Sequence, residues 1–182
     1  HSPKELRLWL VDFKGSEFSL YLKSERFPYQ LPHLDACLCT SDPDYSRSLF
    51  TAIREESERR YNRLKQMKFR NIVEHNDEMR KQGRDDEIIP RIIFLVDEFQ
   101  VIYTKADTKT IESVNTDITI LSKVARAAGV HVIFCSQSMK GTISSDILNM
   151  FTLRICLRCE PEVSLQILGT PYAGNIRQKF GT

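Results

Sequence analysis

The sequence has 182 residues, of which 41% are hydrophobic and 27% are charged, which is typical of a globular chain with one core and excludes intrinsic disorder. Seven Gly and seven Pro residues exclude collagen-like and low-complexity classes, and no apolar run approaches the ~18 residues of a membrane span. The formal charge is only +2, so bulk charge does not indicate a strongly basic nucleic-acid binder.

Hydrophobic periodicity predicts alternating strands and helices. Continuous apolar runs indicate buried strands, and apolar residues three and four positions apart indicate helices. Asp42 and Pro43 supply the cap and first position of a long helix, and Gly129 supplies the stop signal of another. In chain order we expect strands at 6–11, 36–40, 92–96, 130–135 and 151–157, and helices at 43–69, 72–81, 110–128, 144–149 and 161–168. This alternation predicts a single α/β domain over residues 1–182, built on a mostly parallel sheet with helices on its faces.

The five cysteines indicate a reducing compartment. Their number is odd and most lie in apolar runs, so we interpret them as small buried hydrophobes of a cytoplasmic protein. Cys37 and Cys39 alternate along a strand and should face the same side. Cys156 and Cys159 have the two-residue spacing of a zinc knuckle, but neither pair has the turn residues or nearby His that would favour a metal site. We therefore expect no zinc.

Polar residues directly follow three of the predicted strands. In open parallel sheets, ligands bind just beyond the carboxyl ends of the strands. These residues are Asp12 with Lys14, Asp97 with Glu98, and Ser136 with Gln137. Five apolar residues precede Asp97 and Glu98, and a nucleotide hydrolase presents two carboxylates to a metal-bound triphosphate in this way. Asp97 would hold Mg²⁺, directly or through water, and Glu98 would orient or deprotonate the attacking water. The alternative is that such carboxylates cap turns and helices.

Residues 94–99 resemble the Walker B strand of the FtsK/SpoIIIE family of motor ATPases. Other segments of the chain also match that family in order and spacing; they lie at residues 10–15, 31–34, 58–61, 69–76, 126–131 and 135–137. The resemblance implies a three-layer RecA-like fold, incomplete at its N-terminus, that hydrolyses ATP with Mg²⁺. It also implies assembly into a ring, usually of six subunits, that drives a polymer through its centre.

The resemblance also implies site roles. Asp97 would be the Walker B metal-site carboxylate, Glu98 the catalytic glutamate and Gln137 the sensor of the terminal phosphate. Arg126 aligns with the arginine that the family offers to the neighbouring subunit's nucleotide. We also assign Asp12 and Lys14, which follow a strand directly, to nucleotide contact. The alternatives are structural: a cation in a last helical turn is favoured by about 0.3–1 kcal/mol in any case, and a glutamine can satisfy backbone groups at a strand end.

The phosphate-cradling motif G-x-x-x-x-G-K-[ST] is absent from the sequence. Its one G-x-x-x-x-G, from Gly169 to Gly174, is followed by Asn175 and Ile176 and comes after a predicted helix. In the family the motif comes immediately before the strand that begins here at Leu6. We therefore expect the chain to be the C-terminal portion of an ATPase domain and to bind ATP weakly by itself. The alternative is a degenerate, non-catalytic ring or scaffold domain.

The transported substrate is predicted less directly. Many FtsK-like DNA translocases carry Arg-Pro after the sensor glutamine, whereas this chain has Ser138, Met139 and Lys140 at that place. Lys140 is therefore the candidate cation for contact with nucleic acid. Related ATPases of type VII secretion move proteins, and residues 12–15 and 168–169 resemble theirs. The segments at 70–71 and 126–129 favour double-stranded DNA. The parent protein would act in the cytoplasm, with or without an anchor at the inner face of the membrane.

Overall fold

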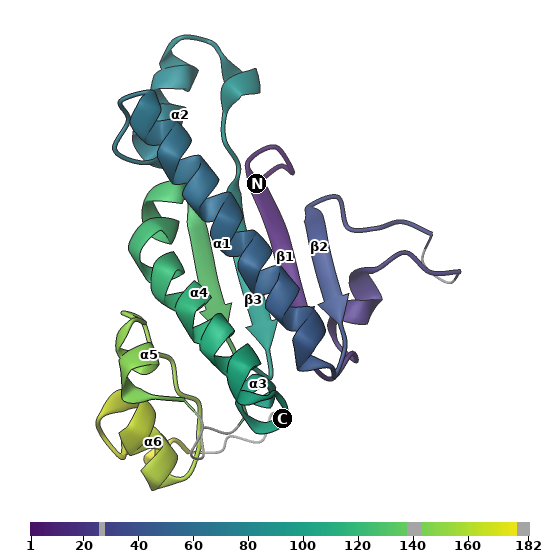
Figure 1. Ribbon diagram of the computed structural model, residues 1–182, viewed down its shortest axis with the longest axis vertical. Coiled ribbons are helices and arrows are strands. Elements are labelled where there is room, and N and C mark those ends of the chain that lie inside the picture. Colours follow the sequence, from purple (N-terminus) through teal and green to yellow (C-terminus); the bar gives the residue numbers. More distant parts are fainter. Residues whose placement is uncertain (26–27, 138–142, 178–182) are drawn as a thin grey trace.

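A four-stranded, all-parallel sheet forms the centre of the computed structural model, which describes residues 1–25, 28–137 and 143–177 (Figure 1). Its strands lie in the order β2-β1-β3-β4, and each pair of neighbours is parallel. The strands are β1 (Leu6–Asp12), β2 (Leu34–Cys39), β3 (Arg91–Asp97) and β4 (Val130–Phe134). The predicted parallel α/β arrangement is therefore confirmed, and the carboxyl ends of all four strands meet at one edge.

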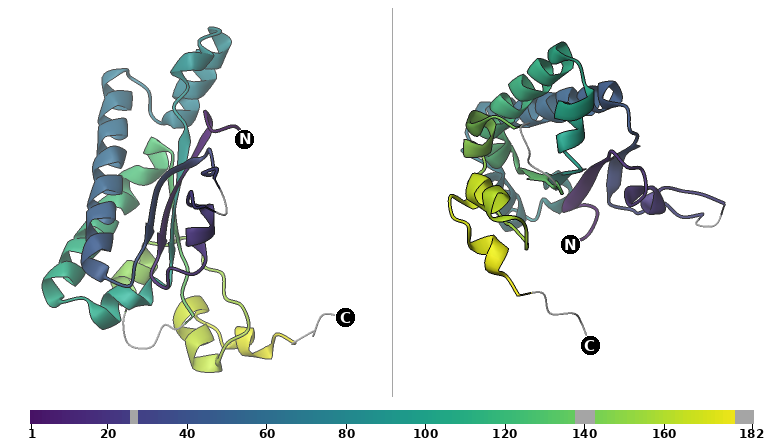
Figure 2. Two further views of the ribbon diagram at one scale, coloured as in Figure 1. Left: turned by 90° about the vertical axis from the view of Figure 1, so that its right-hand side faces the viewer. Right: turned by 90° about the horizontal axis from the view of Figure 1, so that it is seen from below.

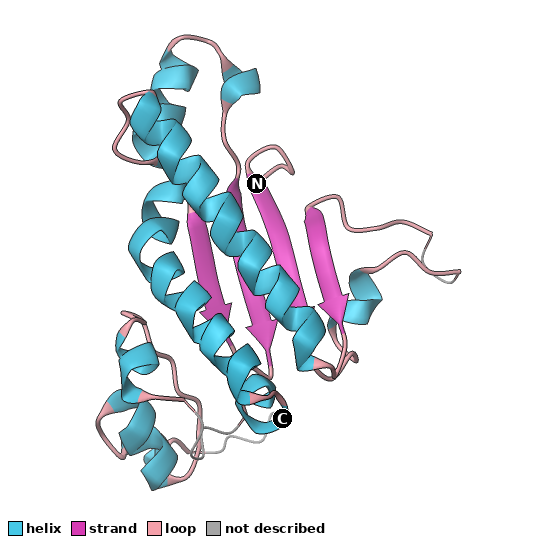
Figure 3. Cartoon of the chain, in the orientation of Figure 1, coloured by secondary structure: helices cyan, strands magenta, loops and turns pink. Residues whose placement is uncertain are grey.

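Two long helices cover one face of this sheet. They are α1 (Pro43–Gln66) and α4 (Thr108–Ala128), which lie side by side across it (Figures 1 and 3). On the opposite side, the described chain places the short 3₁₀ helix η1 (Phe18–Tyr21) near β1 and β2 (Figure 2). The remaining elements are α2 (Ile72–Lys81), η2 (Asp85–Glu87), α3 (Gln100–Lys105), α5 (Ser145–Asn149), α6 (Pro161–Leu168) and η3 (Tyr172–Asn175).

Helix boundaries follow the capping residues in the sequence. Asp42 caps α1 by accepting a hydrogen bond from the backbone N–H of Asp44, with Pro43 in the first turn. Asn71 caps α2, accepting from the N–H groups of the second and third residues after it. Gly129 ends α4 with a left-handed φ of 73°, as the sequence predicts.

An aromatic cluster anchors the end of β3 to the core. Phe50 of α1 lies edge-on to Phe94 of β3, with ring centroids 5.1 Å apart. Phe99, two residues beyond β3, stacks on Phe134 of β4 at 4.0 Å. Because Phe99 is buried, its packing fixes the backbone immediately after Asp97, and the core thereby determines where the carboxylates at this edge lie.

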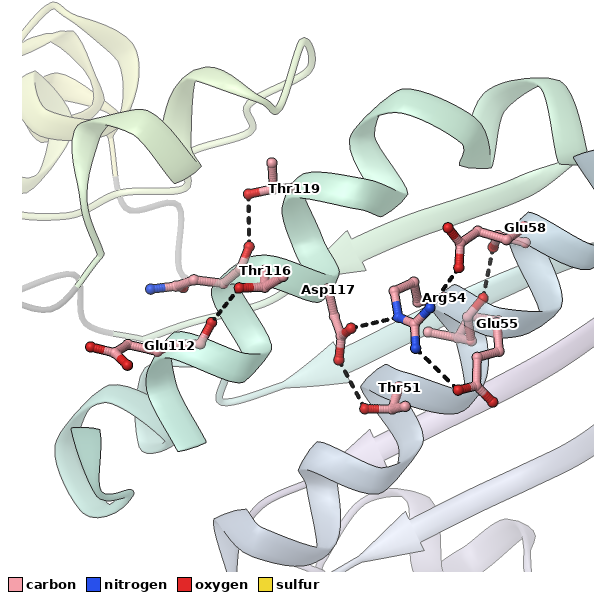
Figure 4. Close-up of polar contacts among 11 residues, drawn as sticks. Thr51, Arg54, Glu55, Glu58, Glu112, Thr116, Asp117 and Thr119 are labelled. Carbon is pink, nitrogen blue, oxygen red and sulfur yellow. Dashed lines mark hydrogen bonds and ion pairs between the residues drawn. The ribbon is translucent and has the colours of Figure 1, made fainter. Parts of the chain in front are cut away.

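Polar side chains join the two long helices (Figure 4). Asp117 of α4 is buried and accepts hydrogen bonds from Thr51 Oγ1 at 2.9 Å and from Arg54 Nε at 2.7 Å, both on α1. Arg54 also donates to Glu58 at 2.5 Å. The buried carboxylate is thus paired and hydrogen-bonded, which fixes the register of the two helices on the sheet.

One predicted element is absent from the structure, and one observed helix was not predicted. The predicted strand at 151–157 is absent, because no described strand lies beside this segment to complete a ladder, and Leu153, Ile155 and Leu157 remain mostly exposed. Helix α3 was not predicted because it has only six residues, too few to show a helical period. It begins two residues after Glu98 and therefore belongs to the site.

The close of α4 yields a stability prediction. A Cβ at Gly129 would meet Ile72 Cδ1 at 2.5 Å, whereas a Cβ at Gly83, with a similar φ of 70°, meets nothing within 4 Å. Gly83→Ala should lower the free energy of unfolding by about 1 kcal/mol, from backbone strain alone. Gly129→Ala should cost about 1–3 kcal/mol more, because Ile72 must move. Urea unfolding followed by the fluorescence of Trp9, the only tryptophan, measures both, and equal losses would contradict the expected clash.

Candidate functional site

The predicted polar residues meet at the carboxyl edge of the sheet. Asp12 and Asp97 are neighbours in the register of β1 and β3. The backbone N–H of Phe99 donates to the carbonyl of Cys135 at 2.9 Å, which brings the turn after β3 against the end of β4. The structure thus gathers Asp12, Lys14, Asp97, Glu98 and Gln137 from the ends of three adjacent strands.

Asp12 organises the loop after β1. Its side chain is fully buried, and its two oxygens accept four backbone hydrogen bonds of 2.8–3.0 Å, from residues 14, 15, 17 and 18. Burial raises the pKa of the Asp12 carboxyl, and these N–H groups lower it by more, so the pKa lies below its ordinary value. The assignment of Asp12 to nucleotide contact is therefore corrected: its oxygens are already used, and it holds the loop that presents Lys14.

Glu98 is buried and lies in a left-handed backbone conformation, with φ of 53°, which a side chain with a Cβ rarely adopts. Its carboxylate is paired with the Lys14 ammonium and accepts hydrogen bonds from the Gln100 side-chain amide and the Gln137 backbone N–H. Burial raises the pKa of Glu98, but these partners, with Lys14 first, hold it below its ordinary value.

Of the three carboxylates at this edge, Asp97 is the one whose negative charge is least compensated by hydrogen-bond donors and cations. Burial and the nearby carboxylates of Glu98 and Asp12 hold the pKa of Asp97 above its ordinary value, although the backbone N–H of Glu98 lowers it. The side chain is only partly buried, at the end of β3. A carboxylate with spare acceptor capacity in a negative surrounding fits a hard divalent cation, since Mg²⁺ in phosphoryl-transfer sites takes one or two carboxylates and completes its shell with water and phosphate.

Gln100 is a site residue that the sequence did not single out. Its amide nitrogen donates to Glu98, and its amide oxygen accepts from Ser136 Oγ at 2.6 Å, so it connects the turn after β3 to the end of β4. Helix α3, on which it lies, has no period to detect, and a glutamine two residues beyond a Walker B-like pair carries no signal of its own.

The structure does not bring Arg126 to this edge. Arg126 lies in the last turn of α4, which leads directly into β4, and therefore at the amino edge of the parallel sheet. It lines a hollow of about 1040 Å³ that runs along β4 beside residues 150–153. None of the three carboxylates at the carboxyl edge lines this hollow. Lys140 lies outside the described residues.

The cysteines form two close pairs. The Sγ atoms of Cys37 and Cys39 are 3.7 Å apart, which confirms that they face the same side of β2, and those of Cys156 and Cys159 are 3.3 Å apart. All five are free thiols. Over the described ranges, no group of three or more His, Cys, Asp or Glu residues is placed to hold a metal ion. A cation at Asp97 would accordingly depend on water and substrate oxygens for its other ligands.

Comparison with known proteins decides the family. Residues 1–159 match the sequence profile of the FtsK/SpoIIIE family. The chain belongs to this family. The DNA translocase FtsK of Campylobacter jejuni strain 81-176 is 28% identical over 174 residues, which cover 93% of this chain and 17% of that protein. The DNA translocase SpoIIIE of Bacillus subtilis strain 168 is 27% identical over 176 residues, or 92% of this chain and 21% of SpoIIIE. The chain thus spans about a fifth of these relatives.

Solved structures support the same fold. The pCW3 conjugation coupling protein TcpA, in its monomer form with ATPγS, superposes with a TM-score of 0.72 and 23% identity, over 95% of this chain and 47% of TcpA. The cytoplasmic domain of the Thermomonospora curvata type VII secretion ATPase EccC gives a TM-score of 0.74 and 25% identity, over 97% of this chain and 20% of that domain. The predicted RecA-like P-loop ATPase fold of this FtsK/SpoIIIE family member is confirmed. None of the described helices is long and apolar enough to cross a bilayer.

The Asp12 loop yields a pH-dependent prediction. Asp12→Asn should lower the free energy of unfolding at pH 7 by about 2–4 kcal/mol, because the amide offers one acceptor oxygen where four donors converge on two. The depressed pKa of Asp12 means that its carboxylate stabilises the fold above the aspartate range and loses this effect as the pH falls through the folded value. The difference from wild type should therefore narrow as the pH falls below the aspartate range. The exposed control Asp86→Asn should change little, and a pH-independent difference would contradict the assignment.

Proposed function

We propose that the protein containing this chain is an ATP-hydrolysing motor that moves double-stranded DNA, and that this chain supplies the carboxylate edge of its active site. The observation that carries the proposal is the placement of Asp97 and Glu98 at the end of a buried central strand, beside the ends of β1 and β4, in a member of the FtsK/SpoIIIE family. The match to relatives named DNA translocases supports the choice of DNA.

Each residue at this edge has a role in the proposal. Asp97 takes Mg²⁺ through water, and the ion, when bound, neutralises charge on the phosphate oxygens. Glu98 orients and deprotonates the hydrolytic water, Gln137 contacts the terminal phosphate, and Lys14 contacts nucleotide phosphate. The chain lacks the G-x-x-x-x-G-K-[ST] motif, so we expect this stretch alone to bind ATP weakly and to turn it over little, if at all.

The position of Arg126 supports assembly of several subunits. It lies at the sheet edge opposite Glu98, so within one subunit it does not reach the same nucleotide. In the proposal its guanidinium serves a nucleotide bound by a neighbouring subunit of a ring, which we expect to be a hexamer. The five free thiols fit work in the cytoplasm, whether or not the rest of the protein holds a membrane anchor.

A second candidate function is ATP-driven protein secretion of the type VII kind. It is favoured by the structural likeness to the secretion ATPase EccC, whose TM-score of 0.74 is as high as that of the conjugation protein. The two functions share the site and differ in the polymer moved, so they are separated by substrate binding. A non-catalytic scaffold role remains as the third, and it requires that Glu98 be dispensable.

Glu98 tests the motor itself. In the complete protein, Glu98→Gln should lower kcat for ATP by about 10²–10⁴ and leave nucleotide affinity near wild type, because the amide keeps the volume but neither accepts a proton nor holds water as a carboxylate does. Steady-state phosphate release and equilibrium nucleotide binding measure the two effects. The exposed variant Glu112→Gln is the matched control. Unchanged turnover in Glu98→Gln would contradict the catalytic role of Glu98, and no turnover in the wild-type protein would favour the scaffold role.

Salt dependence tests the cargo. Filter binding of the complete protein to double-stranded DNA of increasing length should show affinity that falls as a power of salt concentration, with a slope of about −0.9 for each phosphate contacted. Lys140→Met should make that slope shallower by about one unit if this lysine contacts a phosphate. Absence of any length-dependent affinity at low salt would favour the secretion function over DNA.

A further inference from the structure

Glu98 is withdrawn from solvent in this structure. The residue is 1% exposed, and its carboxylate has partners on both oxygens: Lys14 Nζ on Oε1 and Gln100 Nε2 on Oε2, in addition to the backbone N–H of Gln137. A carboxylate that orients or deprotonates water needs an oxygen lone pair open to that water. In the arrangement seen here the Glu98 side chain is 2% exposed, so neither carboxylate oxygen is open to solvent water.

Two of the three partners are fixed by the fold. The Gln100 amide is held on α3 and accepts from Ser136 Oγ through its own oxygen, so it is fixed at both ends. Gln137 donates through its backbone, three residues after β4. Gln100 leaves Glu98 only by also losing its bond to Ser136, and Gln137 leaves only by a shift of the backbone.

Lys14 is the partner that can move. Its side chain is 47% exposed, although the Glu98 side chain it pairs with is 2% exposed. The loop backbone under Lys14 is held by Asp12, which accepts from the N–H of Lys14 itself at 2.9 Å and from that of Gly15 at 2.8 Å. The ammonium can therefore swing on its four-carbon stem while the loop stays in place.

We propose that Lys14 is a latch on Glu98: its ammonium holds the carboxylate withdrawn until a phosphate anion at this edge takes the ammonium in exchange and frees Glu98 for water. This inference rests on the proposed function and specifies how that site is regulated. A phosphate oxygen and a carboxylate compete for the same point charge, so the exchange needs no change of fold. Glu98 can then act on water only when a phosphate group is bound at this edge.

A zero-length cross-link reports the latch directly. A water-soluble carbodiimide activates the Glu98 carboxyl, and attack by Lys14 Nζ joins the two as an amide, with the urea as leaving product. In the complete protein without nucleotide, mass spectrometry should find the peptides of Lys14 and Glu98 joined. With Mg²⁺ and ATPγS the yield should fall at least about fivefold, because the ammonium has moved. Lys14→Arg, which cannot form this amide, identifies the signal.

The outcomes separate the two proposals. Binding of ATPγS is measured on the same samples by equilibrium dialysis. An equal cross-link yield with and without bound ATPγS overturns the latch and leaves the motor function standing. If the buried Glu98 carboxyl does not react with the carbodiimide, the kinetic comparison below decides. Failure of the complete protein to bind ATPγS overturns the proposed function and the latch together.

Kinetics give a second readout that a merely structural role would not produce. Lys14→Met should raise KM for ATP about tenfold and lower kcat far less than Glu98→Gln does, because the phosphate contact is lost while Glu98 is free. Lys14→Arg should restore KM toward wild type. Lys105→Met, which removes an exposed charge at the end of α3, is the matched control and should change neither constant. A Lys14→Met variant with unchanged KM and a kcat as low as that of Glu98→Gln would show that Lys14 only positions Glu98.

Discussion

Three carboxylates converge on one edge of a parallel sheet, and the fold has to balance their mutual repulsion. It does so in three ways. Asp12 is stabilised by backbone N–H groups, Glu98 is paired with the Lys14 ammonium, and Asp97 is left with little compensation. The differing environments push the pKa values of Asp12 and Asp97 in opposite directions, which is how similar side chains come to serve different purposes in one site. The backbone strain at Glu98 belongs to the same arrangement, held in place by the packing of Phe99.

Much of this could be predicted because the relevant signals are local. Continuous apolar runs mark the four strands, Asp42 and Gly129 mark helix ends, and the rule for parallel sheets places the polar residues at a common edge. What could not be predicted depends on three-dimensional neighbours. The burial of Asp12, the Lys14–Glu98 pair and the role of Gln100 follow from loop geometry that no periodicity encodes. The segment at 151–157 has the pattern of a strand, but a pattern does not provide the adjacent strand that a ladder needs.

Several segments that carry the family resemblance serve the fold. Arg60 is buried and donates to the carbonyl of Pro90, while Asn76 donates to the carbonyl of Ile89 at 2.8 Å and accepts from its N–H at 3.0 Å. These contacts from α1 and α2 fix the chain immediately before β3. Arg70, which belongs to a segment that favours DNA, pairs with Glu74 beside the cap of α2. The resemblance therefore identifies the family correctly, but the residues that carry it include both site residues and residues that hold the backbone before β3 in place.

The row of exposed side chains at 153, 155 and 157 has a consequence for the behaviour of the chain. These three residues are 76%, 77% and 80% exposed, and β4 ends the sheet with one edge unpaired among the described strands. The unpaired edge of β4 in one molecule can form backbone hydrogen bonds with the exposed apolar segment at 151–157 of another molecule, which adds a strand to the sheet. Self-association of the purified chain should therefore begin along this border.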